Sequence, residues 1–143
     1  MNFKIWTNAN LAPEAMDLLR EGIGDHELVQ AGEKTTNLGG GTASESLIEA
    51  TVAFGQPDPV QMIELPLLRW THLTSAGYTR YDRGDLRTAL TDRGALLTNS
   101  SSVFDEPCAQ HLLAFMLASR VSCPNRCAAN GVRAIGAMVA FDL

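Results

Sequence analysis

The residues best suited to bind a small ligand lie at positions 73–78, where a short apolar strand gives way to small residues. Ser75, Ala76 and Gly77 have little or no side chain, so successive backbone N–H groups can stay uncovered. A run of uncovered N–H groups binds anions such as a carboxylate. The alternative interpretation is a plain strand-to-helix turn that needs a glycine for a positive φ.

These residues must be positioned by the strands and helices around them. Short apolar or alternating segments predict strands at 3–7, 26–29, 52–54, 70–73 and 95–97, separated by amphipathic segments that predict helices at 13–22, 44–48, 58–65, 85–93 and 105–119. The polar, glycine-rich segment 31–42 is expected to be a surface loop. This alternation predicts an α/β fold with a parallel sheet and helices on both faces. Residues 55–57 and 75–77 then follow strands at one carboxyl edge, where such folds bind ligands.

Composition narrows the class of protein. The chain has 143 residues, 45% of them hydrophobic, which suits one domain with a buried core. A net charge of -5 with scattered Lys and Arg argues against a nucleic-acid partner. No apolar run reaches the roughly 18 residues of a membrane span, and the first residues lack a secretory signal. Three cysteines make a disulfide framework improbable, so a cytoplasmic location is expected.

Several blocks in order along residues 1–120 resemble the D-isomer-specific 2-hydroxyacid dehydrogenases, and among them members labelled phosphoglycerate dehydrogenase-like. The blocks that carry the resemblance are VAFGQP at 52–57, HLTSAGYTRYD at 72–82, LTNS at 97–100 and EPCAQH at 106–111. The family has a flavodoxin-like substrate domain and a Rossmann domain, with substrate and NAD or NADP in the cleft between them. The resemblance therefore implies a doubly wound, five-stranded parallel sheet followed by a long interface helix.

The resemblance also implies where a 2-hydroxy or 2-keto acid would bind. The substrate-binding residues would be Gly55, Gln56, Ser75, Ala76, Gly77 and Tyr78. By the same resemblance, residues 1–98 form an incomplete substrate domain and residues 99–120 the hinge and first helix of the cofactor domain. The helix around 106–119 would lie at an interface. With its partners absent, we expect self-association through its apolar side chains.

The family's Gly-x-Gly-x-x-Gly cofactor fingerprint does not occur in the 143 residues. The segment at 39–42 lacks that spacing. The family's catalytic Arg, Glu and His cannot be assigned here either, so no catalytic or cofactor-binding residue is predicted and the chain alone is expected to be inactive. Residues 121–143 depart from the family pattern, which favours a frameshift over a short paralogue with a diverged tail.

Three alternatives stay open. Cys108, His111, Cys123 and Cys127 have ligand types and spacings that a zinc site can use, although residues like the first two normally serve packing on an apolar helix. Cys108 can also be considered as a nucleophile at a helix N-terminus. Finally, the chain can be a flavodoxin-like binding or interaction module without chemistry. We predict no metal site.

Overall fold

The computed structural model describes residues 2–120. The chain divides into two compact units, Met1–Val103 and Phe104–Leu143, and each is described here by itself. The first unit contains the sheet and the candidate ligand-binding residues. Within residues 2–120, no helix is both long and apolar enough to cross a membrane.

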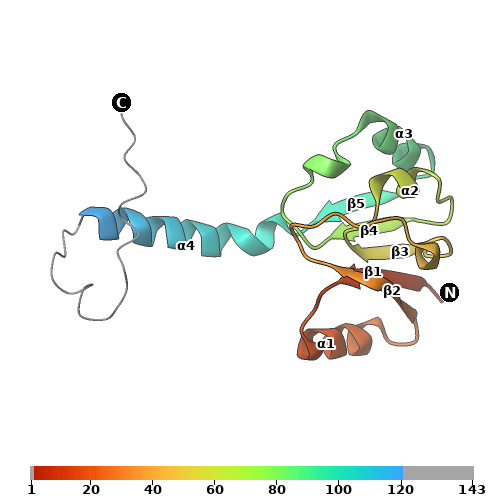
Figure 1. The fold of residues 1–143 in the computed structure, drawn as a ribbon, viewed down its shortest axis with the longest axis horizontal. Coiled ribbons are helices and arrows are strands. Elements are labelled where there is room, and N and C mark those ends of the chain that lie inside the picture. Colours follow the sequence, from red (N-terminus) through yellow and green to blue (C-terminus); the bar gives the residue numbers. More distant parts are fainter. Residues whose placement is uncertain (1, 121–143) are drawn as a thin grey trace. The chain divides into compact units, whose positions relative to one another are not determined.

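The centre of the first unit is a five-stranded sheet in which every strand pair is parallel (Figure 1). Its strand order is β2-β1-β3-β4-β5, which is the order of flavodoxin-like folds. The α/β class and the five-stranded parallel sheet predicted from the sequence are therefore confirmed. The strands are β1 (Lys4–Ala9), β2 (Glu27–Thr35), β3 (Val52–Gly55), β4 (Trp70–Leu73) and β5 (Leu96–Asn99).

Helices connect the strands, and local sequence explains where several of them begin and end. Pro13 occupies the first turn of α1, where its missing N–H is not needed. Asp58 accepts hydrogen bonds from the Val60 and Gln61 amides and so caps α2. Within residues 2–120 the helical elements are α1 (Pro13–Ile23), η1 (Glu45–Leu47), α2 (Pro59–Ile63), η2 (Thr79–Tyr81), α3 (Gly84–Asp92) and α4 (Ser101–Arg120).

The main core lies between the sheet and the helices α2 and α3. Alternation along the strands sends Trp6, Ala53 and Leu73 to this face, and all three are buried. They pack in one cluster with residues from η1, α2 and α3, among them Leu47, Met62 and Leu86. Arg93 donates to the carbonyls of Met62 and Ile63 at the end of α2, and burial lowers the pKa of its guanidinium.

The opposite face of the sheet carries α1, which lies on the side away from α2 and α3 (Figure 1). At the β4–β5 end of this face, Trp70 is 44% and Leu96 64% exposed. Parallel sheets of this kind are normally covered on both sides. This part of the second face therefore presents large apolar side chains to solvent.

The predicted loop at 31–42 was wrong in its first half, because β2 continues to Thr35. Thr35 pairs with Ala9 after a register shift between Thr7 and Ala9. β2 is an edge strand, so Glu33 and Lys34 can stay exposed and give the sequence a loop-like, polar character. Ser44 directly precedes η1, but its side chain accepts no capping hydrogen bond from the backbone of that turn.

The boundary between β5 and α4 also differs from the prediction. Asn99 belongs to β5, and α4 begins at Ser101 rather than near Asp105. Pro107 and the acidic residues before it suggested a helix start, yet they lie inside the helix, and the first turn of α4 contains no acidic residue. Only Ser100 therefore separates β5 from α4. The Asn99 side chain accepts from the Ser101 hydroxyl at 2.9 Å, which stabilises this early start.

Candidate functional site

At the carboxyl edge of the sheet, the Asn8 side chain of β1 bonds to the backbone of Gln56 after β3 and so closes this part of the edge to a ligand. It lies at the register shift in β1, and such irregularities redirect side chains. Its Oδ1 accepts from the Gln56 amide at 2.7 Å, and its Nδ2 donates to the Gln56 carbonyl at 2.8 Å and to Thr35 Oγ1 at 3.1 Å. The side chain therefore satisfies both backbone groups of Gln56, which is itself buried.

Gly55 is required at the end of β3. Its φ of 144° lies in a region that side chains disfavour, and a Cβ there would overlap Asn8 Oδ1. A side chain at Gly55 would therefore break the contact between Asn8 and Gln56.

The Gln56 side chain links this closed side to the turn after β4. Its Nε2 donates to Ser75 Oγ at 3.0 Å and lies 3.3 Å from Thr74 Oγ1. Its Oε1 is 3.3 Å from the hydroxyl of Tyr81, which donates to the Pro57 carbonyl at 2.8 Å. Burial raises the pKa of Tyr81 to about 12, so the phenol stays a donor at neutral pH. Gln56 thus contributes by holding Ser75 in place.

The carbonyl groups of the turn at 75–77 all accept hydrogen bonds from within the protein. Ser75 O accepts from the Ser100 amide at 3.1 Å, Ala76 O from Asn99 Nδ2 at 2.8 Å, and Gly77 O from Ser75 Oγ at 2.7 Å. These bonds come from the start of α4, the end of β5 and the turn itself. They fix the orientation of the peptide groups.

The amides of the same turn are used differently. Among the described residues, none of the backbone N–H groups of Ser75, Ala76, Gly77 and Tyr78 donates a hydrogen bond. Gly77 and Tyr78 are exposed, and a Cβ added at Gly77 would meet nothing within 4 Å. Gly77 has no positive φ, so the fold does not require a glycine there. The turn therefore offers unpaired donors beside open space, which is the arrangement that binds an anion.

His72 connects β4 to β5 on the less covered face of the sheet. Its Nδ1 lies 2.9 Å from Thr98 Oγ1, which also accepts from Trp70 Nε1, and its Nε2 lies 3.1 Å from Ser100 Oγ. Phe54 stacks on its ring. Ser100 in turn donates to the Leu73 carbonyl at 2.9 Å. This network supports the segment that supplies hydrogen bonds to the turn.

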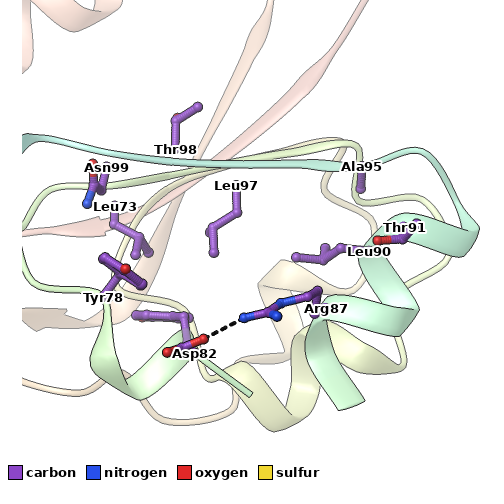
Figure 2. Close-up of a pocket in the computed structure, with 11 residues that line it drawn as sticks. Leu73, Tyr78, Asp82, Arg87, Leu90, Thr91, Ala95, Leu97, Thr98 and Asn99 are labelled. Atoms are coloured by element: carbon purple, nitrogen blue, oxygen red, sulfur yellow. Dashed lines mark hydrogen bonds and ion pairs between the residues drawn. The ribbon is translucent and has the colours of Figure 1, made fainter. Parts of the chain in front are cut away.

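A cavity of about 410 Å³ adjoins the turn through Tyr78 and Asn99 (Figure 2). Leu73 and Leu97 point from the strands toward it, whereas Thr98 points away, and an ion pair of 2.7 Å joins Arg87 to Asp82 across from the two leucines. The cavity has a mixed lining, with Leu73, Leu90 and Leu97 beside polar groups such as Asn99 and Thr91. It gives room for the uncharged part of a small ligand.

The structure brings all the predicted substrate-binding residues to one edge of the sheet. Gly55 and Gln56 end β3, and Ser75, Ala76, Gly77 and Tyr78 follow β4, as the sequence predicted. The sequence analysis missed Asn8, Tyr81 and the role of Asn99 as a donor to the turn. A polar residue ending the first strand was the available signal for Asn8, because the ends of parallel strands share an edge.

A dinucleotide does not fit the glycine-rich loop that precedes η1. Gly41 packs against the Gln56 carbonyl and Gly40 against the guanidinium of Arg80, so both glycines are used in contacts within the protein. The loop also follows the turn after β2 and leads into a single 3₁₀ turn, whereas dinucleotide binding uses the N-terminus of a full helix. This loop therefore lacks the geometry of a dinucleotide-binding turn.

The structure bears differently on the two hypotheses that involve cysteines, the Cys108 nucleophile and the zinc site. Cys108 is an exposed free thiol, and because α4 begins at Ser101 it lies two turns inside the helix rather than at its N-terminus. His111 contacts the Phe115 ring edge-on. Cys123 and Cys127 lie outside the described residues, as does the tail expected to depart from the family. Within residues 2–120 no group of His, Cys, Asp and Glu is arranged to hold a metal ion.

No family model matches the chain, and a search of curated proteins finds no match.

Proposed function

We propose that the first unit of this chain is the substrate-binding domain of an NAD- or NADP-dependent D-2-hydroxyacid dehydrogenase, an oxidoreductase that interconverts 2-hydroxy and 2-keto acids. The proposal assigns the substrate carboxylate to the turn at 75–78. It assigns neither a catalytic residue nor a cofactor site to residues 2–120. By the proposal, hydride transfer needs a nucleotide-binding part with the Gly-x-Gly-x-x-Gly spacing that these 143 residues lack.

One observation carries the proposal. In the turn at 75–78, carbonyl groups accept hydrogen bonds from within the protein, whereas the amides donate none to the described residues. Three consecutive carbonyls accept hydrogen bonds from Ser100, Asn99 and Ser75, while the amides from Ser75 to Tyr78 have no acceptor among the described residues. A purely structural turn would have no need for this asymmetry. Preorganised amides bind a carboxylate without first losing other partners.

Each neighbouring residue then has a defined part in the proposal. Gln56 and Tyr81 hold Ser75, and Asn8 holds Gln56, so these residues position the turn rather than contact the acid. Gly77 leaves space for close approach of the carboxylate. The adjoining cavity, lined in part by Leu73 and Leu97, leaves space beside the turn for uncharged atoms of a ligand.

The proposal is tested by titrating the full chain with D-lactate while recording amide chemical shifts by NMR. We expect the largest shifts at Ser75, Ala76, Gly77 and Tyr78. Gly77→Ala should weaken binding about tenfold or more, because a methyl group occupies the approach to the amides and displaces a charge-assisted hydrogen bond.

Gly22→Ala is the matched control, because its Cβ would also meet nothing within 4 Å and it lies in α1, outside the site. It should leave D-lactate binding unchanged. Shifts that avoid residues 75–78, or a Gly77→Ala chain that binds as well as the original, would contradict the proposal and favour a binding or interaction module without a carboxylate site. Turnover of glyoxylate with NADH by this chain alone would contradict the absence of catalytic and cofactor residues.

The proposal includes self-association through α4. Its side chains Leu112, Leu113, Phe115, Met116 and Leu117 are between 52% and 62% exposed. Apolar side chains gathered on one helix in this way promote contact with another apolar surface. Sedimentation velocity should show dimers or larger species at micromolar concentration, and Leu113→Glu should shift them toward monomer. A monomer at all concentrations would contradict this part of the proposal.

A further inference from the structure

Arg80 is the arginine that stands apart from the others whose side chains the structure describes. Unlike them, it forms no hydrogen bond and no ion pair with any residue in the range 2–120. Each of those has a partner: Arg20 with Asp17, Arg69 with Arg93 O, Arg83 with Asp85, Arg87 with Asp82, and Arg93 with Met62 O. A guanidinium without a partner is available for an anion outside the protein.

The guanidinium of Arg80 lies beside the glycine-rich loop that precedes η1. It lies against Gly40, and a Cβ added to that glycine would overlap its Nη1. The next residue, Gly41, packs against the Gln56 carbonyl and Asn8 Nδ2 in the same way. Because neither glycine has a side chain, the loop can pack against the Gln56 carbonyl at Gly41 and against the Arg80 guanidinium at Gly40.

Arg80 also lies near the proposed carboxylate site. It belongs to η2, two residues after Tyr78, and its neighbour Tyr81 donates its hydroxyl to the Pro57 carbonyl. The Tyr81 hydroxyl is 3.3 Å from Gln56 Oε1, and Gln56 Nε2 is 3.0 Å from Ser75 Oγ. Asp58 uses its carboxylate to cap α2 and does not pair with Arg80.

We infer that Arg80, held beside the Gly40–Gly41 loop, recognises a second negatively charged group on the substrate, so that the site selects 2-hydroxy acids with two carboxylates. This inference rests on the proposed function, because the turn at 75–78 must hold the first carboxylate. A guanidinium binds a carboxylate through two parallel hydrogen bonds, which gives it both strength and directional selectivity. An acid with one carboxylate leaves Arg80 unused.

The test compares D-lactate with D-malate. D-Malate carries a CH₂-carboxylate group where D-lactate carries a methyl group. Dissociation constants are measured by NMR titration of the full chain and of Arg80→Gln. The original chain should bind D-malate about tenfold more tightly than D-lactate, the size expected for an added charge-assisted interaction. Arg80→Gln should lose that preference and keep its affinity for D-lactate.

Arg20→Gln is the matched control, because it removes the same charge from an exposed arginine on α1. It should keep the preference for D-malate. Gly40→Ala provides a second variant: its methyl group displaces the guanidinium, so the preference should fall while the melting temperature stays close to that of the original chain. Melting temperatures of all variants show that each is folded.

The outcomes separate the two proposals. If D-lactate binds at residues 75–78 but D-malate binds no better, the inference about Arg80 is overturned and the proposed function stands. If Arg80→Gln weakens both acids equally, Arg80 serves the first carboxylate or the fold, which also overturns it. If neither acid binds, both proposals fail.

Discussion

Two turns at the same edge of the sheet, residues 55–57 after β3 and residues 75–78 after β4, use their backbone groups in opposite ways. In the first turn, Asn8 pairs with both the amide and the carbonyl of Gln56. In the second turn the carbonyls are paired and the amides are not. The comparison shows how one edge can combine a rigid, closed part with an open part that can bind a ligand.

Glycine has a different purpose in each turn. Gly55 is required by its backbone conformation and by the close approach of Asn8, so it serves the fold. Gly77 has neither a positive φ nor a neighbour within 4 Å of its missing Cβ. Substitutions on the closed side should therefore change stability, and substitutions in the open turn should change binding.

The largest loss of stability is expected for Gly55→Ala. A side chain at a φ of 144° is strained and would overlap Asn8, so the free energy of unfolding should fall by about 3 kcal/mol in urea denaturation. Gly32→Ala is the control, since Gly32 is exposed in β2 and has open space around it. A Gly55→Ala chain as stable as the Gly32→Ala chain would remove the distinction between the two turns.

Asn8→Ala should have the next largest effect. It leaves the amide and carbonyl of Gln56 without their partner in a buried position, which should lower the free energy of unfolding by about 2 kcal/mol. The hydrogen bond from Gln56 Nε2 to Ser75 Oγ should weaken as well, so D-lactate binding should also weaken. Asn37→Ala, in an exposed turn, should change neither quantity.

Tyr81→Phe should cost about 1 kcal/mol, because one hydrogen bond to the Pro57 carbonyl is lost. Its effect should also depend on pH. The pKa of Tyr81 is raised to about 12 by burial, from an ordinary value of 10.0. The folded state favours the neutral phenol, so this contribution is fully present below pH 10 and is lost as the pH rises toward 12.

Urea denaturation of both chains at several alkaline pH values checks this prediction. The difference in stability between the original chain and Tyr81→Phe should shrink as the pH rises above about 10. Tyr78→Phe is the control, because that hydroxyl is exposed and makes no hydrogen bond with the described residues in the structure. A difference that stays constant with pH would contradict the buried role of Tyr81.

The smallest change in stability is expected in the open turn itself. Gly77→Ala should alter the free energy of unfolding by no more than about 0.5 kcal/mol, because its methyl group points into open space. The same variant should lose D-lactate binding. A large loss of stability would mean that Gly77 serves the fold in the way Gly55 does.

Much of the fold could be predicted because local pattern and tertiary structure agree. β4 was predicted with the bounds that the structure gives it, since a short apolar segment is enclosed by turn residues. The end of β2 was not, because Gly32, Glu33 and Lys34 have no local preference for a strand, and the strand continues through them to Thr35, which pairs with Ala9. Likewise, Pro107 suggested a helix start, although α4 begins at Ser101.

The candidate site was predictable only in part for the same reason. Small residues marked the turn at 75–77, and the order of strands placed it beside Gly55 and Gln56. Nothing local marks Asn8 or Tyr81 as its supports, because their partners lie 48 and 24 positions away along the chain. Whether an amide is free depends on such distant partners, so the contrast between the two turns became visible only in three dimensions.

Amide hydrogen exchange, measured residue by residue with and without D-lactate, tests the central contrast most directly. The Gln56 amide, bonded to Asn8, should exchange slowly in both conditions, and the amides of Ala76, Gly77 and Tyr78 should exchange rapidly until D-lactate slows them. Turn amides that are already protected without ligand, or that D-lactate leaves unchanged, would contradict the account.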